Sequence, residues 1–370
     1  MGTTVNRRNW LKTAGLGITG LGLSAFEGLA YEKDLVASRE LLEDSRIFLN
    51  ANENPYGPSP MARKAMAESI EKSNRYGMKM ISQLVSAVAE KNGVTDKNIL
   101  FEAGSTKILD LILRYAGTEG GSFITPSNTF DFWMRPAEQF GFERISVPLT
   151  KDQKHDLPAM LAAIRPNTKL VYVCNPNNPT GTICKHEELL DFIEKASQKA
   201  MVLVDEAYIE LTDEKSMATL ISENKNVVVA RTFSKLYGMA GARVGYAMAH
   251  EETLSKIKAL QSWPHGGVSK VSVAGALAVL KDDTFLQDVI VKNAEARSFA
   301  ISGMEKLGIK CIPSYTNFFY FSLANYEKDF FEQLEKNNIL GTRMYEEDGK
   351  WSRITVGTMD EMKTLIRALA

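Results

Sequence analysis

Cysteine is scarce in this sequence of 370 residues, and nothing in its placement indicates a structural framework. Cys174, Cys184 and Cys311 cannot all pair, and no Cys-x-x-Cys spacing suggests a zinc site. The four histidines are scattered without ligand spacing, so we expect them at the surface or at helix caps. A chain of this length can bury a large core without disulfide or metal staples. We therefore expect no metal site.

An excess of charge of either sign is also missing. Lys and Arg total 44 against 45 Asp and Glu, which gives a formal net charge of -1. Without a basic excess, nucleic-acid binding is disfavoured as a main role. Apolar residues make up 44% and charged residues 24%, which excludes disordered, collagen-like and coiled-coil classes. The length fits two or three domains, or one large α/β domain with a smaller companion.

The apolar stretch at the N-terminus is too short for a stable membrane span. Asn6-Arg7-Arg8-Asn9-Trp10-Leu11-Lys12 precedes a Gly-rich, mildly apolar run over residues 13–26, and Gly28-Leu29-Ala30 supplies small residues before a possible cleavage point. About 14 apolar residues cannot cross the ~30 Å of membrane hydrocarbon. The paired arginines resemble the bacterial twin-arginine signal, so we expect residues 1–30 to be a signal peptide and the protein to be periplasmic.

Two alternatives apply to this segment. It could form a buried N-terminal helix, although the five glycines between Gly15 and Gly28 disfavour one. If the signal is not used, the protein is cytoplasmic.

The rest of the chain alternates between β-rich and helical patterns, which predicts an α/β fold. Strands rich in Val and Ile, separated by amphipathic helices, indicate a mostly parallel seven-stranded sheet covered on both faces. The expected strands are 99–101, 123–125, 145–147, 170–173, 201–204, 227–230 and 244–247. After about residue 282, a long helix, a strand at 318–321 and further helices predict a smaller α+β domain. We expect a joining segment at 31–60, a large domain at 61–282 and a small domain at 283–370.

Polar residues follow four of these strands, where ligands bind in open parallel sheets. Glu102-Ala103-Gly104-Ser105 follows the first, and a small-residue loop that opens a helix suits a phosphate. Asn175-Pro176-Asn177-Asn178-Pro179-Thr180-Gly181 follows the fourth, and Asp205-Glu206-Ala207-Tyr208 the fifth. Thr232-Phe233-Ser234-Lys235 follows the sixth, with Arg243 eight residues beyond the lysine. Each segment alone is equally consistent with a structural turn or helix start.

Pyridoxal phosphate is the one ligand that would use all four segments. It needs an acid at its ring nitrogen, donors at its phenolic oxygen, an anion cradle at its phosphate and an amine for its aldehyde. Asp205 would meet the ring nitrogen, and Asn178 with Tyr208 the phenolic oxygen. Lys235 would meet the aldehyde. The phosphate would lie among Ala103, Gly104, Ser105, Thr232, Ser234 and Arg243.

The chain resembles the fold-type I aminotransferases, and within them the histidinol-phosphate aminotransferases, from about Phe48 to the C-terminus. The resemblance implies an aspartate-aminotransferase-like fold and pyridoxal phosphate as cofactor. The motifs that carry it are Leu49-Asn50-Ala51-Asn52-Glu53-Asn54-Pro55-Tyr56-Gly57-Pro58-Ser59-Pro60, Asn74-Arg75-Tyr76, Asn177-Asn178-Pro179-Thr180-Gly181, Asp205-Glu206-Ala207-Tyr208, Ser234-Lys235 with Arg243, and Arg353-Ile354-Thr355-Val356-Gly357-Thr358.

The resemblance also implies roles for individual residues. Lys235 matches the lysine that holds the cofactor aldehyde and later moves a proton, and Asp205 matches the acid that keeps the ring nitrogen protonated. Arg353 matches the arginine that binds the substrate carboxylate, or its equivalent, through two hydrogen bonds. Tyr76 matches a tyrosine that reaches the cofactor phosphate from the other subunit, which implies a homodimer with active sites at the interface.

Three further positions concern the substrate and the cofactor ring. Arg343 matches the arginine that binds the phosphate of histidinol phosphate, and Asn52 is also expected at the substrate. Phe130 fits best as the aromatic residue stacked on the cofactor ring, with Phe132 and Trp133 as alternatives and a plain core role equally consistent.

The implied activity is a transaminase with a ping-pong mechanism. It would move an amino group between an amino acid or histidinol-phosphate-like amine and a 2-oxo acid such as 2-oxoglutarate. The alternatives are another pyridoxal-phosphate reaction, such as decarboxylation, elimination, racemisation or oxidation, and a binding protein that kept the fold. Three departures from the relatives leave the substrate open. They are the acidic residues Glu346-Glu347-Asp348, the pair Thr106-Lys107, and the segment 262–269.

Overall fold

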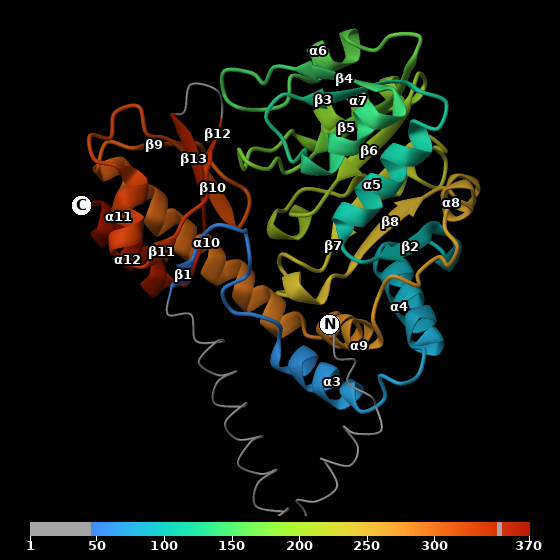
Figure 1. The fold of residues 1–370 in the computed structure, drawn as a ribbon, viewed down its shortest axis with the longest axis horizontal. Helices are drawn as coiled ribbons and strands as arrows, with labels where there is room; N and C mark the ends of the chain where they lie inside the picture. Colours follow the sequence, from blue (N-terminus) through green and yellow to red (C-terminus); the bar gives the residue numbers. More distant parts are fainter. Residues whose placement is uncertain (1–45, 346–349) are drawn as a thin grey trace, which may run out of the picture. The chain divides into compact units, whose positions relative to one another are not determined.

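The computed structural model describes residues 46–345 and 350–370. The predicted signal peptide and Glu346, Glu347 and Asp348 therefore lie outside the described residues. Figure 1 shows two lobes, a larger one built on a wide sheet and a smaller one that contains the C-terminus. Among the described residues, no helix has both the length and the apolar character needed to cross a membrane.

The large lobe is organised by a seven-stranded sheet in the order β2-β8-β7-β6-β5-β3-β4. β8 runs antiparallel to both of its neighbours and the remaining pairs are parallel, so the predicted mostly parallel sheet is confirmed. Its strands are β2 (Ile99–Glu102), β3 (Gly121–Pro126), β4 (Phe142–Val147), β5 (Thr168–Cys174), β6 (Met201–Asp205), β7 (Val227–Thr232) and β8 (Gly245–Ala249). Each contains one of the seven expected runs, except that β8 starts one residue later.

Helices cover both faces of this sheet, because each central strand is apolar on both sides. One face carries Val171, Val173 and Val202 beneath α3 (Pro60–Ile70), α4 (Met78–Lys91), α6 (Leu157–Ala162), α7 (His186–Ser197) and α9 (Lys270–Val279). The other carries Leu170, Tyr172 and Leu203 beneath α5 (Ser105–Ala116), the 3-10 segment η2 (Phe132–Phe140) and α8 (Glu251–Lys258). Two apolar layers thus bury both faces of the sheet, and the ends of its strands remain available for functional side chains.

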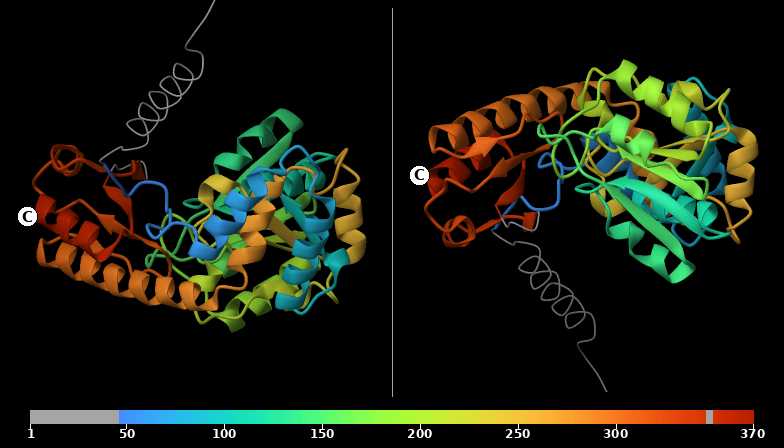
Figure 2. Two further views of the ribbon diagram at one scale, coloured as in Figure 1. Left: turned by 90° about the horizontal axis from the view of Figure 1, so that it is seen from below. Right: turned by 90° about the horizontal axis from the view of Figure 1, so that it is seen from above.

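The small lobe is a four-stranded antiparallel sheet with its own apolar core, in the order β12-β13-β10-β9. Its strands are β9 (Lys310–Cys311), β10 (Phe318–Ser322), β12 (Met344–Tyr345) and β13 (Trp351–Thr355), packed with α11 (Phe330–Lys336) and α12 (Met359–Leu369). The long helix α10 (Asp283–Lys306) extends from the large lobe along the small one (Figures 1 and 2). A smaller α+β lobe is therefore confirmed as part of the fold.

The N-terminal segment of the described chain belongs partly to the small lobe. β1 (Ile47–Phe48) pairs in parallel with β11 (Ile339–Leu340), and the backbone N–H of Thr355 donates to the carbonyl of Leu49 at 2.9 Å. The joining segment at 31–60 stays a prediction, and its residues 31–45 lie outside the described residues. The residue boundaries of the domains stay predictions.

One expectation about histidine is wrong. His250 caps α8 by accepting a hydrogen bond from the Glu252 N–H, as expected. His155 is instead buried in the large lobe, and burial lowers its pKa to about 4. Among residues 46–345 and 350–370, no group of three His, Cys, Asp or Glu side chains is placed to hold a metal ion.

Candidate active site

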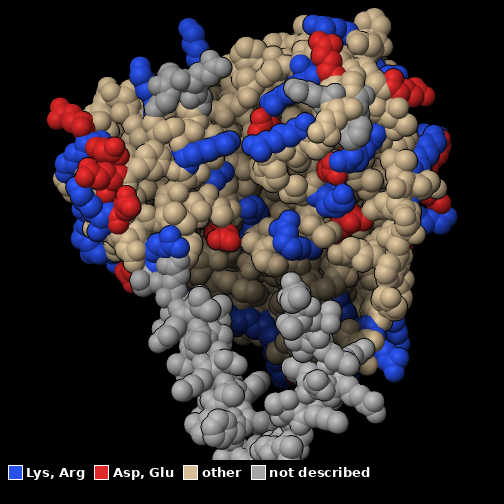
Figure 3. Space-filling view, viewed as in Figure 1, with Lys and Arg blue, Asp and Glu red and all other residues tan. Residues whose placement is uncertain are grey.

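A cavity of about 500 Å3 lies where the strand ends of the large sheet face the small lobe. On the face seen in Figure 3, Lys and Arg side chains gather around the hollow between the lobes, with several acidic residues interspersed among them. The predicted site residues that line the cavity are Asn52, Ser105, Phe130, Asn178, Asp205, Tyr208, Thr232, Ser234, Lys235, Arg243, Arg343 and Arg353. One cavity therefore unites residues that are up to 301 positions apart in the sequence.

Asp205 ends β6 with its carboxylate inside the cavity and almost no solvent exposure. Oδ2 accepts a hydrogen bond from the Tyr172 hydroxyl at 3.0 Å, and Oδ1 accepts one from the Ala207 N–H at 3.1 Å. Burial raises the Asp205 pKa to about 6, although both donors oppose the shift. A carboxylate in this setting is stabilised by a cation or a further donor on its cavity side.

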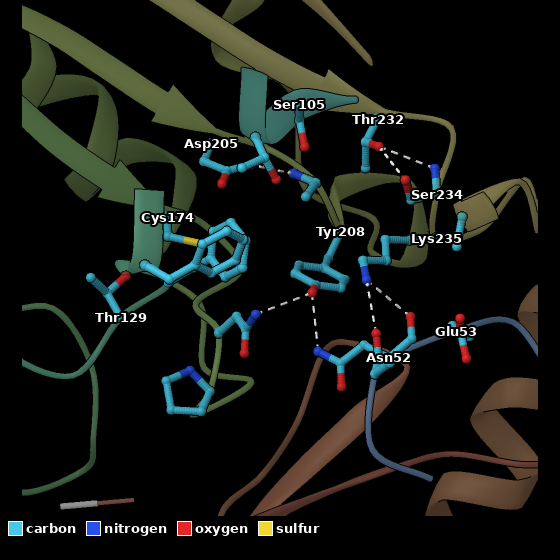
Figure 4. Close-up of a pocket in the computed structure, with 18 of the residues that line it drawn as sticks. Asn52, Glu53, Ser105, Thr129, Cys174, Asp205, Tyr208, Thr232, Ser234 and Lys235 are labelled. Atoms are coloured by element: carbon cyan, nitrogen blue, oxygen red, sulfur yellow. Dashed lines mark hydrogen bonds between the residues drawn. The ribbon is translucent and has the colours of Figure 1, made fainter. Parts of the chain in front are cut away.

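Lys235 projects into the same cavity from the loop after β7. Its Nζ donates to the carbonyls of Ala51 and Asn52, both at 3.2 Å. Burial and the positive charge of Arg353 lower the Lys235 pKa to about 8. A substantial share of this amine is therefore neutral near pH 8, which is the form that attacks a carbonyl. Figure 4 shows Lys235 and Asp205 on opposite sides of the Tyr208 ring.

The Tyr208 hydroxyl is held by two amides. It accepts hydrogen bonds from Asn52 Nδ2 at 3.1 Å and from Asn178 Nδ2 at 3.4 Å (Figure 4). Burial raises the Tyr208 pKa above its ordinary value, so the phenol keeps its proton. Because both contacts use the oxygen as acceptor, the hydroxyl hydrogen is available to a ligand.

A cradle of donors lies at the end of β7 and the start of α5. The Ser234 N–H donates to Thr232 Oγ1 at 3.1 Å, and Arg243 Nη1 reaches Ser234 Oγ at 3.5 Å. Ser105 begins α5, whose first N–H groups and dipole favour an anion.

Gly104 precedes α5 with a φ of +88°, and a Cβ there would lie 2.1 Å from Arg243 Nη2. Only glycine therefore lets the guanidinium approach the helix start. A hydroxyl pair, a helix N-terminus and a close arginine form a donor set that fits the phosphate of pyridoxal phosphate.

Arg353 extends from β13 into the substrate side of the cavity and is 7% exposed. Its Nη1 donates to Asn178 Oδ1 at 2.5 Å, and its Nη2 donates to the Asn50 carbonyl at 2.8 Å. Its Nε has no hydrogen-bond partner among the described residues. The Arg353 side chain lines the cavity, and each Nη carries a second hydrogen, so the guanidinium can meet an anionic group of a substrate there.

Arg343 lies at the rim of the cavity and is exposed. Its guanidinium carbon is 5.2 Å from the ring centre of Tyr345, and that of Arg353 is 5.7 Å from the same ring. The two predicted substrate arginines therefore share one aromatic neighbour.

Two phenylalanines compete for the ring-stacking role. Phe130 and Phe132 both line the cavity, and their ring centres are 4.7 Å apart at a steep angle. Trp133 does not line it and is buried against Tyr172. The choice between Phe130 and Phe132 stays open.

Three predicted cofactor residues, Ala103, Gly104 and Tyr76, do not line the cavity, although Gly104 lies directly before Ser105, which does. Ala103 lines a shallow neighbouring groove beside Arg243. Tyr76 is 82% exposed and lies in a second groove, with its ring edge-on to Trp263 at 5.2 Å.

Several residues of the site were not found from the sequence. Tyr172 bonds Asp205, and Glu53, Cys174 and Tyr345 line the cavity. Asn317 holds the N-terminal loop, because its Nδ2 donates to the Asn52 carbonyl at 2.9 Å. Tyr172 and Cys174 lie two positions apart and so on one face of β5, which was the available signal.

Comparisons with known proteins agree on one family. The sequence model described as "Aminotransferase class I and II" matches residues 45–369. The histidinol-phosphate aminotransferase of Moorella thermoacetica is 35% identical over 336 residues, covering 90% of this chain and 86% of the relative. Histidinol-phosphate aminotransferase 1 of Dechloromonas aromatica is 36% identical over 326 residues, covering 87% of this chain and 89% of the relative.

Solved structures give the same result for the fold. Histidinol-phosphate aminotransferase from Sinorhizobium meliloti, in complex with pyridoxal-5'-phosphate, has a TM-score of 0.78 at 28% identity and covers 87% of this chain and 89% of that one. Aspartate aminotransferase from Thermus thermophilus has a TM-score of 0.77 at 19% identity, covers 95% of this chain and 98% of that one, and shows the shared fold.

Proposed function

From the premise that this chain belongs to the class I and II aminotransferases, we propose histidinol phosphate or a similar amine with an anionic group as its amino donor and 2-oxoglutarate as its acceptor. The protein is a pyridoxal-phosphate-dependent transaminase, and the other reactions considered from the sequence are not favoured. The observation that carries the substrate proposal is that one cavity contains both the buried Arg353 guanidinium and, at its rim, Arg343.

Different cavity residues would contact different parts of the cofactor. When bound, pyridoxal phosphate supplies an aldehyde that takes up the amino group and a ring that withdraws electrons from the substrate carbon. Asp205 would face the ring nitrogen and hold its proton, while the Tyr208 hydroxyl would donate to the phenolic oxygen. Ser105, Thr232, Ser234, Arg243 and the loop of Ala103 and Gly104 would hold the phosphate.

Lys235 has two tasks in this arrangement. Its neutral amine would hold the cofactor aldehyde in the resting enzyme. After the substrate amine takes its place, Lys235 Nζ would accept the proton from the substrate carbon that bears nitrogen and return it to the cofactor carbon that carried the aldehyde. A pKa lowered to about 8 suits an amine that both accepts and releases a proton near neutral pH.

Arg353 and Arg343 would select the substrate by charge. Arg353 is held by the Asn178 side chain and the Asn50 carbonyl, so it can bind an anion without reorganising. Arg343 would bind a second anionic group nearer solvent, and Asn52 would complete the wall between them. Glu53 also lines the cavity, so a substrate part that carries positive charge would be tolerated on that side.

The test of the substrate is an amino-donor screen on purified protein with 2-oxoglutarate, in which glutamate formation is measured. Histidinol phosphate should give the highest kcat/KM, and Arg343→Ala should raise its KM at least about tenfold, the effect of losing one charge-assisted contact. The KM of a donor without a phosphate should change little in the same variant. A parent enzyme that leaves histidinol phosphate unused would contradict the proposal.

A homodimer would bring Tyr76 to the second active site. Tyr76 and Trp263 are 82% and 46% exposed, a large apolar surface for two neighbouring aromatic residues. A second copy seated on this groove would bury both rings and place the Tyr76 hydroxyl near the partner's phosphate cradle. Analytical ultracentrifugation should give twice the chain mass, and a monomer at micromolar concentration would exclude the arrangement.

Export by the twin-arginine route is the proposal for localisation. Arg7 and Arg8 precede a short apolar run, and this route carries folded cargo, which suits a protein that must first acquire a cofactor. Replacing both arginines with lysine should retain the precursor in the cytoplasm, as fractionation and immunoblotting would show. Unchanged periplasmic enzyme would refute the signal.

A further inference from the structure

We propose that Tyr172 is a positioning residue that orients the Asp205 carboxylate toward the cofactor ring nitrogen and favours its charged form. The inference rests on the placement of Asp205 at that nitrogen, proposed above. Tyr172 does not line the cavity, so it would act only through Asp205.

The protein donates one hydrogen bond to each oxygen of the Asp205 carboxylate. Tyr172 donates to Oδ2 at 3.0 Å and the Ala207 N–H donates to Oδ1 at 3.1 Å, so each oxygen is anchored once by the protein. Asp205 itself lines the cavity, and its remaining acceptor capacity is therefore available there. Two anchors on separate oxygens fix the plane of the carboxylate, which one anchor could not do.

The strand register explains how the phenol reaches Asp205. β5 and β6 are parallel neighbours, with Cys174 opposite Asp205 and Tyr172 opposite Leu203. Side chains alternate along a strand, so Tyr172, Cys174, Leu203 and Asp205 share one face of the sheet. The tyrosine lies one side-chain step behind the strand end and extends forward to the carboxylate.

The Tyr172 ring has little freedom to leave this position. It is 0% exposed, and the Trp133 ring packs edge-on against it at 5.0 Å. Trp133 is itself anchored, because its Nε1 donates to the Phe130 carbonyl at 2.8 Å. One packed series therefore links Phe130, which lines the cavity, to Trp133, Tyr172 and Asp205. The hydrogen bond cannot be exchanged for one to water.

The hydrogen bond from Tyr172 affects the protonation state of Asp205. Burial pulls Asp205 toward its neutral form, and among the groups around it the Tyr172 hydroxyl, the Ala207 N–H and Lys235 favour the charge while Glu206 opposes it. Burial raises the Tyr172 pKa well above its ordinary value, with the Asp205 charge adding to the effect, so the hydroxyl keeps the proton it donates. The other titratable neighbours, Cys174 and Tyr208, also have raised pKa values and stay neutral.

The test compares two cofactors in Tyr172→Phe. Apoprotein is titrated with pyridoxal phosphate and with its carbocyclic analogue, in which a C–H replaces the ring nitrogen. Loss of a hydrogen bond to a charged group should weaken pyridoxal phosphate about tenfold or more. The analogue cannot use Asp205, so its dissociation constant should change less than about twofold, and this intact binding also shows that the variant is folded.

Tyr246→Phe is the matched control, because Tyr246 is a buried tyrosine whose ring lies in the apolar cluster on the opposite face of the sheet, away from Asp205. It should change neither dissociation constant. The parent should also lose affinity for pyridoxal phosphate as the pH falls through about 6, where Asp205 takes up a proton, and Tyr172→Phe should do so at higher pH.

Each other outcome overturns the inference. Equal weakening of both cofactors in Tyr172→Phe would show a role in packing alone, and no weakening of either would show that the bond does not matter. A parent that binds both cofactors equally would overturn the placement of the ring nitrogen at Asp205, and this inference with it. If the parent binds pyridoxal phosphate more tightly than the analogue, and Tyr172→Phe has the same two dissociation constants as the parent, the role of Tyr172 is overturned. The placement of the ring nitrogen at Asp205 would then still stand.

Discussion

Lys235→Ala should reduce transamination at least about ten-thousandfold, because the variant loses both the amine that holds the cofactor and the group that moves the substrate proton. Lys235 alone supplies an amine among the described cavity residues, since the other basic groups there are the guanidinium groups of Arg243, Arg343 and Arg353. Arginine stays protonated at working pH and cannot replace a neutral amine. The measurement is single-turnover conversion of the donor together with the absorbance spectrum of the bound cofactor.

Chemical rescue separates this role from a structural one. A small primary amine added to Lys235→Ala should restore part of the proton-transfer rate, because it can enter the cavity that the truncated side chain leaves. Lys97→Ala is the matched control: Lys97 pairs with Glu251 on the exposed surface and should leave the rate unchanged. An unaltered cofactor spectrum in Lys235→Ala would mean that another group holds the aldehyde.

Much of the large lobe could be predicted because its strands and the residues that follow them have clear local sequence patterns. The Val- and Ile-rich runs become strands because both faces of the sheet are covered, so no polar alternation interrupts them. Candidate ligand-binding residues follow directly after four of these runs, and parallel strands end at one edge of the sheet. Asp205 and Lys235 could thus be placed near one ligand without a structure, since β6 and β7 are adjacent.

The parts that could not be predicted depend on contacts without a local signal. Tyr172 reads as one more apolar residue of a buried strand, and only the register between β5 and β6 brings it to Asp205. The Asn52 N–H donates to Thr355 Oγ1, which lies 303 positions away in the sequence. The spacing of apolar residues in strands and helices cannot indicate a contact between such distant residues. Phe130 and Phe132 are two residues apart in an irregular segment, so neither strand nor helix spacing separates their roles.

Asp205→Asn should nearly abolish activity while making the apoprotein more stable at neutral pH. The amide cannot hold a protonated ring nitrogen, so the cofactor loses much of its pull on electrons. We expect at least about a thousandfold loss in kcat, the upper range for removing one electrostatic contact in an active site. The bound cofactor should also titrate at its ring nitrogen in the variant, which its absorbance against pH would report.

The stability change follows from the raised pKa of Asp205 in the folded apoprotein. Burial moves this pKa from 3.8 to about 6, so the folded state binds more protons than the unfolded chain between these values, and stability falls as the pH rises through them. Two pKa units correspond to about 3 kcal/mol of cost at pH 7.5. The amide removes this cost. It offers only one acceptor oxygen to the Tyr172 hydroxyl and the Ala207 N–H, so the loss of a hydrogen bond destabilises the variant by about 1–2 kcal/mol.

A net gain of about 1–2 kcal/mol in the free energy of unfolding is therefore expected for Asp205→Asn apoprotein at pH 7.5. Near pH 4 the parent carboxyl is protonated in the fold and no longer carries this cost, so the variant should not be the more stable of the two. Urea unfolding of both apoproteins at the two pH values measures the difference, and Asp96→Asn, on the exposed surface, should show no such pH-dependent gain. A variant less stable than its parent at pH 7.5 would show that Asp205 is not held at a cost in the apoprotein. The expected pattern would mean that the fold maintains a destabilised charge at position 205 because catalysis requires it.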